Sequence, residues 1–209
     1  MIEDIKQQAI STIASCAAEY DKNLNDCRLL FILKDRYNHA SFFEASFYSY
    51  NFLHLTGIKL IGGITAADFY SRCLNHKISS DDFVFAADGT TVLKLEVLPQ
   101  LVKKDVSARM VGNFIGCNPK LYTEKLAGGV KACLGFVKTD KDEYVPNTVL
   151  NTDIRTTTVG LEQVVATYRR KKTDLFYHER VYKTKKIDLT NFTFPKEYSY
   201  LARLEWGKD

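Results

Sequence analysis

Turn signals divide the second half of the chain into short apolar runs, and this pattern constrains the fold more than any other feature. The signals are Asn118-Pro119, Gly128-Gly129 and the polar stretch 139–143. Four runs around them are rich in β-branched and aromatic residues and are predicted strands: 108–117, 121–126, 130–138 and 144–158. The stretch 161–168 fits a helix or a strand, but its β-branched content and the alternation over 176–182 favour a hairpin.

The first half of the chain mixes helical and strand patterns. Apolar residues recur at helical spacing from Ile2 to Tyr20, which predicts an amphipathic helix that packs across the sheet. A run bounded by charges, 28–34, fits a strand buried on both faces, and the aromatic stretch 41–50 fits a second strand. The apolar run 51–58 then predicts a third strand of a meander.

Two further helices follow in the first half. Thr65 precedes Asp68 by three residues, which is the spacing of a helix cap, and predicts a helix over about 65–76. Asp88-Gly89 is a turn pair, after which Thr90 or Thr91 caps a helix. Pro99 lacks the N–H that a helix interior needs, so we expect a kink there or two short helices.

These elements predict an α+β fold, in which an antiparallel sheet packs against the N-terminal helix and short inserted helices. No repeat, linker or low-complexity stretch divides the chain. We therefore expect one domain over residues 1–209, with a core over about 26–186. The remaining segment, 187–209, is expected to be an ordered terminal wrap.

Composition excludes several classes of protein. No run approaches the about 18 to 20 apolar residues of a membrane span, and the N-terminus lacks the pattern of a secretion signal. The five cysteines are odd in number and never spaced as a metal-binding pair, so we expect free thiols in a cytoplasmic protein: Cys16, Cys27, Cys73, Cys117 and Cys133. The four histidines lie far apart, and no phosphate-binding glycine loop or Gly-x-Ser-x-Gly motif occurs. We therefore expect no metal and no cofactor.

His54 lies within the apolar run 51–58. In a strand, His54 and Thr56 share one face because side chains alternate. An imidazole titrates near neutral pH, so this face is suited to proton transfer. A structural histidine held by hydrogen bonds is the competing interpretation.

A local basic segment, residues 168–186, stands out from the rest of the chain. It carries a net charge of +6, whereas the whole chain carries +4. Its first basic residues are Arg169, Arg170, Lys171 and Lys172, and its rings are Tyr168, Phe176, Tyr177 and Tyr182. Cations beside flat rings suit a phosphate backbone with unstacked bases. A solvated hairpin whose lysines protect an edge strand fits the same residues.

Metal-independent RNA cleavage needs a base for the ribose 2′-hydroxyl, an acid for the leaving 5′-oxygen and cations for the crowded phosphorane. Lys94, Lys125 and Arg155 are weaker candidates for phosphate binding. Each has a plainer interpretation: Lys94 extends from an apolar helix to water, Lys125 is a surface charge beside Glu124, and Arg155 pairs with Asp153.

Six short motifs carry a resemblance to a known family: 51–58 (Asn-Phe-Leu-His-Leu-Thr-Gly-Ile), 67–70, 88–94, 123–128, 133–136 and 144–148. With these motifs the chain resembles the fourth phage-associated nuclease family grouped with barnase, EndoU, the tRNA-cleaving colicins and RelE. The resemblance implies a barnase/EndoU/RelE-like fold and metal-independent RNA cleavage, with His54 and Thr56 as catalytic residues. The chain departs from barnase-type enzymes because no glutamate stands at a recognisable position for the general base.

Two hypotheses follow. In the first, the chain is a toxin-like or mobile-element ribonuclease whose partner is RNA, with His54 as acid or base. In the second, it is an inactive binding or inhibitory protein of the same fold, which acts on nucleic acid or on a host or phage protein. A neutralising partner protein and the oligomeric state are not encoded in any recognisable motif.

Overall fold

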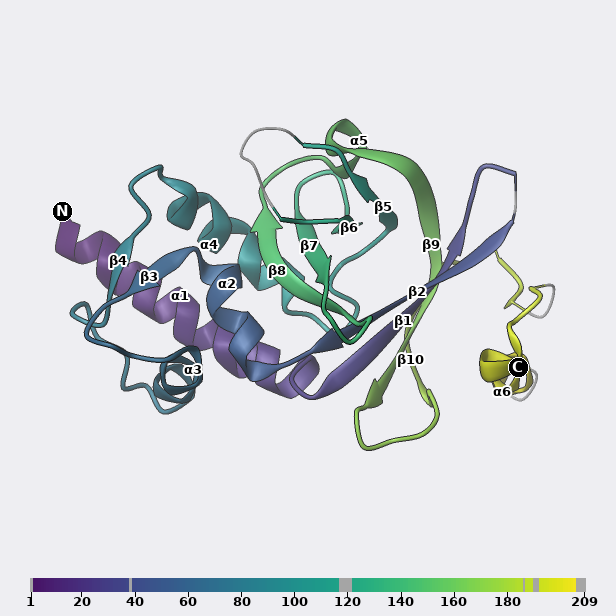
Figure 1. Cartoon of the computed structure of the whole chain (residues 1–209), viewed down its shortest axis with the longest axis horizontal. Helices are drawn as coiled ribbons and strands as arrows, with labels where there is room; N and C mark the ends of the chain where they lie inside the picture. Colours follow the sequence, from purple (N-terminus) through teal and green to yellow (C-terminus); the bar gives the residue numbers. More distant parts are fainter. Residues whose placement is uncertain (1, 38, 117–121, 186, 190–191, 206–209) are drawn as a thin grey trace.

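The computed structural model of the chain describes residues 2–37, 39–116, 122–185, 187–189 and 192–205 (Figure 1). It has the mixed α+β composition that the sequence predicts. Its helices are α1 (Ile2–Asn23), α2 (Phe52–Thr56), α3 (Ala66–Leu74), α4 (Thr90–Leu101), α5 (Ile154–Thr157) and α6 (Tyr200–Glu205), with the 3-10 turns η1 (Ser49–Asn51) and η3 (Lys196–Tyr198). Its strands are β1 (Cys27–Lys34), β2 (Ala40–Phe47), β3 (Ile58–Leu60), β4 (Phe83–Phe85), β5 (Met110–Phe114), β6 (Lys125–Gly128), β7 (Cys133–Lys138), β8 (Tyr144–Leu150), β9 (Thr158–Lys171) and β10 (Glu179–Lys183).

Seven strands close into a barrel, which corrects the simple antiparallel sheet predicted from the sequence. β1 pairs with both β2 and β9, so the order β1-β2-β8-β7-β6-β5-β9 returns to its start, and β10 adds to β9. The pairing of β2 with β8, at Ala45 and Tyr144, is parallel, whereas the other pairings in the ring are antiparallel. Closure depends on pairing between strands far apart in the chain, which strand periodicity does not encode.

β9 makes the closure possible because it is long and irregular. Its first half pairs with β5, and its second half lies between β1 and β10. Register shifts at Ile32/Leu33 and Val111/Asn113 mark irregularities of the kind that bend a sheet. Figure 1 shows β9 curving from α5 down to the hairpin with β10. The predicted hairpin of this region is confirmed.

The main core lies between the barrel and the helices α1 to α4, which gather at one side of it (Figure 1). Tyr20 of α1 is fully buried there, and its ring centroid lies 5.3 Å from that of Phe52 and 6.1 Å from that of Tyr70. Its hydroxyl donates to the main-chain oxygen of Tyr48. The predicted amphipathic helix is therefore confirmed as α1, and its apolar face anchors the segment that follows β2.

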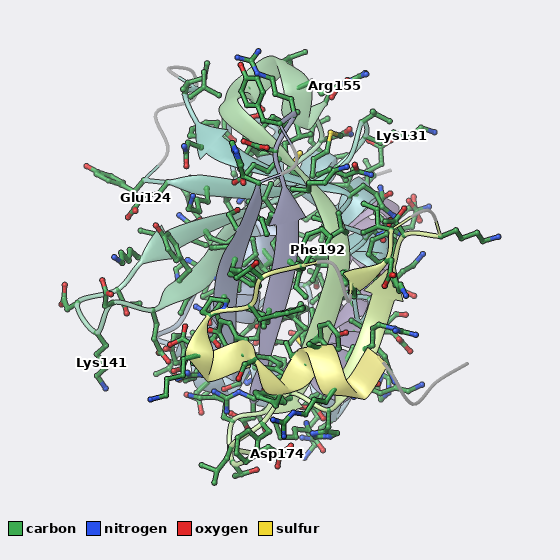
Figure 2. The ribbon with its side chains drawn as sticks, turned by 90° about the vertical axis from the view of Figure 1, so that its right-hand side faces the viewer. Glu124, Lys131, Lys141, Arg155, Asp174 and Phe192 are labelled. Atoms are coloured by element: carbon green, nitrogen blue, oxygen red, sulfur yellow. The ribbon has the colours of Figure 1, made fainter. Side chains whose placement is uncertain are left out.

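β1 is buried on both faces, as the sequence predicts. Phe31 belongs to the main core, whereas Leu30 and Ile32 belong to a second core with Leu189 and Leu201. Figure 2 shows α6 and the segment that carries Phe192 lying across these strands. The C-terminal segment therefore covers an outer face of the barrel.

Two predicted elements of the first half are wrong. The run 51–58 does not continue the sheet as a strand: β2 ends at Phe47, and residues 49–56 form η1 and α2. Alternation of apolar residues over so short a run fits a helical turn as well as a strand. Pro99 lies inside α4, which runs undivided from Thr90 to Leu101, so the expectation of two short helices is wrong, and a kink at Pro99 stays a prediction.

Three other expectations concern a membrane span, a metal site and the cysteine thiols. Within the described ranges, no helix is long and apolar enough to cross a membrane. Among the same residues, no group of three His, Cys, Asp or Glu side chains is placed to hold a metal ion. Cys16, Cys27, Cys73 and Cys133 are buried free thiols, and Cys117 and the Asn118-Pro119 turn lie outside the described residues.

Candidate functional site

His54 lies on a helical turn, residues 49–57, which we call the His54 turn. The side chain of Asn51 accepts a hydrogen bond from the main-chain N–H of Tyr48 over 3.1 Å and fixes where the turn begins. Gly57 ends it with a φ of +72°, a left-handed conformation that favours glycine. His54 is exposed on this turn, and Asn51, Phe52, Leu55 and Thr56 are buried beneath it.

α4 holds the end of the His54 turn in place. Asp88 accepts hydrogen bonds from the N–H and the hydroxyl of Thr90, and so orders the start of the helix. The hydroxyl of Thr91 donates to the main-chain oxygen of Gly57 over 2.6 Å and accepts from the N–H of Ala86 over 2.9 Å. The fold thus brings together the motifs 51–58 and 88–94, which are separate in the sequence.

Lys94 lies against His54. Its ammonium donates to the main-chain oxygen of His54 over 3.1 Å. Partial burial lowers the pKa of the His54 imidazole, and the charge of Lys94 lowers it further. Burial also lowers the pKa of the Lys94 ammonium, against the opposing influence of Asp88. The pair therefore combines an imidazole that is neutral at pH 7 with a cation that gives up its proton more readily than a free lysine.

Thr56 does not share a face with His54, which corrects that expectation. Its side chain is 0% exposed, and its hydroxyl donates to the main-chain oxygen of Leu53 over 2.7 Å. The same hydroxyl accepts a 3.4 Å hydrogen bond from the N–H of Ile58. The first bond lies within the turn and the second joins the turn to β3, so Thr56 is placed to hold the shape of the turn that presents His54.

The neighbouring surface contains a polar network with no signal in the sequence. Glu143, directly before β8, accepts hydrogen bonds from Tyr48 (2.7 Å) and Ser46 (3.2 Å) and pairs with Arg28. Arg28 also pairs with Glu44 at 3.0 Å. Arg28 and Glu143 are 115 positions apart, so no spacing in the sequence reveals the pair.

Glu143 is held as a carboxylate by this network. Partial burial alone raises its pKa, but the hydrogen bonds from Tyr48 and Ser46 and the charge of Arg28 outweigh burial and lower the pKa. Burial and the bond to Glu143 raise the pKa of Tyr48 to about 12, so its hydroxyl remains a donor. A carboxylate with a lowered pKa is a weak base, so the network fits a role in positioning Tyr48 better than one in proton abstraction.

The basic segment is only partly available to a ligand. Arg169 pairs with Glu179 and donates to the main-chain oxygen of Asn23, and the guanidinium of Arg170 donates to the main-chain oxygen of Asp174. Lys171 is exposed and donates to the main-chain oxygen of Asn25. Lys172 differs from these residues, because its ammonium lies 3.4 Å above the ring of Tyr48.

Two rings of the basic segment are buried, contrary to the expectation that they stack with bases. Tyr168 is 1% and Tyr177 is 2% exposed, and both belong to the second core. The hydroxyl of Tyr177 donates to Glu44 over 2.6 Å. Tyr168 lies in β9 and Tyr177 lies in the loop between β9 and β10, so packing against the C-terminal segment buries both rings, and the sequence of the hairpin does not reveal that packing.

Lys125 and Arg155 lie apart from the His54 turn. Lys125 donates to the side chain of Asn113 over 2.9 Å and lies 5.8 Å from the ring centroid of Phe43. Arg155 pairs with Asp153 in α5, as its plainer interpretation has it. Figure 2 shows Arg155 and Asp174 at opposite ends of the molecule. The predicted phosphate-binding residues therefore do not form one continuous surface.

Comparison with known proteins finds one family. A family model described as "phage-Barnase-EndoU-ColicinE5/D-RelE like nuclease4" matches residues 12–186. This match confirms the resemblance drawn from the short motifs. Neither the curated proteins nor the solved structures give a match to the chain.

Proposed function

Because the chain belongs to this family of nucleases, we propose that it is an endoribonuclease that cleaves RNA without a metal ion. The observation that carries the proposal is the contact between Lys94 and the turn that exposes His54. A neutral imidazole and a neighbouring ammonium are the base and the acid that cleavage through the 2′-hydroxyl requires.

In this reaction His54 takes the proton of the ribose 2′-hydroxyl while the 2′-oxygen bonds to the adjacent phosphorus. The bond from phosphorus to the 5′-oxygen breaks, and Lys94 gives its proton to that oxygen. The products are a 2′,3′-cyclic phosphate and a 5′-hydroxyl. The charge of Lys94 also stabilises the phosphorane before its proton is transferred.

The other predicted site residues take supporting roles. Thr56 is a positioning residue, since its hydroxyl is bonded within the turn. Lys171 and Lys172 attract the phosphate backbone, and Arg169 and Arg170 order the strand end that carries them. We propose that Lys125 and Arg155 contact phosphates of a bound RNA that lie farther from the cleaved bond. The proposal includes a toxin-like role in the cytoplasm, where the four buried thiols stay reduced.

The test is incubation of the purified protein with RNA in excess EDTA, followed by analysis of the RNA ends. We expect cyclic-phosphate ends from the wild-type protein and a loss of at least about 100-fold in rate with His54→Ala. His76→Asn is the matched control, because His76 is also exposed and its φ of +54° suits asparagine. Cleavage that persists in His54→Ala contradicts the site, and cleavage that EDTA abolishes contradicts the absence of a metal.

A second candidate function is RNA binding without cleavage. The observation in its favour is that Glu143, a carboxylate of the network described above, is bound by Arg28, Tyr48 and Ser46 and is a weak base. In this case RNA binds with the same affinity to the wild-type protein and to His54→Ala, and no cyclic-phosphate ends form.

A further inference from the structure

Two stacked tyrosines lie at the N-terminal end of the His54 turn. The ring centroids of Tyr48 and Tyr50 lie 5.1 Å apart at an interplanar angle of 18°, and we call this pair the tyrosine platform. The ammonium of Lys172 lies 3.4 Å above the Tyr48 ring, where it fills one face of that ring. Steric exclusion then puts Tyr50 against the other face. The outer ring of the stack is therefore Tyr50, which is 47% exposed.

Hydrogen bonds to Tyr48 hold the platform in place. The Tyr48 hydroxyl donates to Glu143 over 2.7 Å, and Arg28 and Ser46 hold that carboxylate. The main-chain oxygen of Tyr48 accepts from the buried hydroxyl of Tyr20 over 2.9 Å. A ring whose orientation is fixed before binding loses less conformational entropy when a ligand stacks on it.

The platform also lies next to the proposed reacting groups. Tyr50 and His54 are four positions apart on the His54 turn and are both exposed, so they lie about one helical turn from each other. Lys94 contacts this turn through the main-chain oxygen of His54. Contacts and chain positions therefore give the order cation, two rings, imidazole and cation: Lys172, Tyr48, Tyr50, His54 and Lys94.

From this order we propose that the tyrosine platform is the base-stacking subsite of the protein for single-stranded RNA. An unpaired base stacks on the exposed face of Tyr50, and Lys172 and Lys94 contact phosphates on either side. Aromatic stacking needs a base whose face is free, so single strands bind and paired duplexes do not. The assignment of the substrate rests on the proposed function, but the stacking contact itself does not require cleavage.

The test measures binding to a single-stranded oligonucleotide of 2′-O-methyl RNA, which lacks the attacking hydroxyl and stays intact. We expect Tyr50→Ala to weaken binding about tenfold or more and Tyr50→Phe to bind like the wild-type protein. A duplex of the same sequence is expected to bind the wild-type protein more weakly than the single strand does, and Tyr50→Ala is expected to leave this weak binding unchanged. Fluorescence anisotropy gives each affinity at one fixed salt concentration.

Tyr37→Ala is the matched control. Tyr37 is also an exposed tyrosine with a cation on its ring, that of Arg36. It precedes β2, whereas Tyr48 follows β2, so the eight residues of that strand separate them by about 25 Å. We expect Tyr37→Ala to bind like the wild-type protein.

The outcomes separate this inference from the proposed function. Equal binding by Tyr50→Ala and the wild-type protein overturns the stacking subsite, even if His54→Ala abolishes cleavage. An equal loss in Tyr37→Ala and Tyr50→Ala also overturns it, because the effect is then not local. A loss confined to Tyr50→Ala supports the subsite, even if no variant cleaves RNA.

Discussion

The ammonium of Lys94 donates a hydrogen bond to the main-chain oxygen of His54 over 3.1 Å. This contact joins α4 to the His54 turn and places a cation beside the imidazole. Its geometry depends on Gly57 and Thr91, which bring the two elements into contact.

Gly57→Ala is expected to destabilise the protein more than Gly89→Ala does. Both glycines have similar positive φ values, +72° and +77°, so the backbone penalty is similar. A Cβ on Gly57 lies 2.7 Å from Cδ of Lys94 and 3.3 Å from Cα of Thr91, whereas one on Gly89 meets nothing within 4 Å. We expect Gly57→Ala to cost about 1 kcal/mol more, measured by urea unfolding.

Displacement of Lys94 in Gly57→Ala is also expected to lower the rate of RNA cleavage, while Gly89→Ala leaves the rate near that of the wild-type protein. Equal losses of stability in the two variants contradict the close packing of the His54 turn on α4.

The pH dependence of cleavage is expected to be bell-shaped. The base must be deprotonated, so the rate rises as pH increases through the pKa of His54, which lies below 6.5. The acid must be protonated, so the rate falls as pH increases through the pKa of Lys94, which lies below 10.5. Single-turnover rates between pH 5 and 11 give both limbs.

Lys94→Arg is the informative variant for the alkaline limb. A guanidinium keeps the charge but does not lose its proton in this range, so the alkaline limb is expected to disappear and the maximal rate to fall. An alkaline limb that is unchanged in Lys94→Arg rules out Lys94 as the acid.

Arg169→Gln and Lys172→Gln are expected to affect different properties, stability and RNA binding respectively, although each removes one positive charge. Arg169 is bonded to Glu179 and to the oxygen of Asn23, so its loss costs about 1 to 3 kcal/mol of stability. Lys172 contacts the face of Tyr48, so its loss weakens RNA binding and lowers the salt slope by about 1. Urea unfolding and binding at several salt concentrations measure the two effects, and an unchanged salt slope in Lys172→Gln excludes a phosphate contact.

In Glu143→Gln, the free energy of unfolding is expected to change less between neutral and acidic pH than in the wild-type protein. The folded-state pKa of Glu143 is lowered from 4.5, so its carboxylate stabilises the fold fully above about pH 4.5. This stabilisation is lost as pH falls through the lower folded-state pKa. Unfolding free energies at pH 7 and pH 3.5 should therefore differ more in the wild-type protein than in Glu143→Gln. The opposite order means that Glu143 is not held as a carboxylate.

Local sequence patterns predicted much of the fold. The spacing of apolar residues predicted α1, the cap at Thr65 predicted α3, and the turn signals predicted β5 to β8. The strand predicted over 144–158 is wrong in its last part, because β8 ends at Leu150 and residues 154–157 form α5. The same patterns were misleading at residues 51–58, where four apolar residues in eight fit a strand and a helical turn equally. Gly57 was the signal for a helix end there, since its left-handed conformation terminates α2.

Most helices and strands, the nuclease family and the prominence of His54 could be predicted from the sequence, because each is encoded in short stretches of residues. The closure of the barrel, the burial of Thr56, Tyr168 and Tyr177, and the partners of His54 became known only from the folded structure. Those features depend on contacts between residues such as Arg28 and Glu143, which are distant in the chain. The local sequence pattern determines which face of its own helix or strand a side chain occupies. The packing of that element against distant parts of the chain determines which residues the side chain contacts.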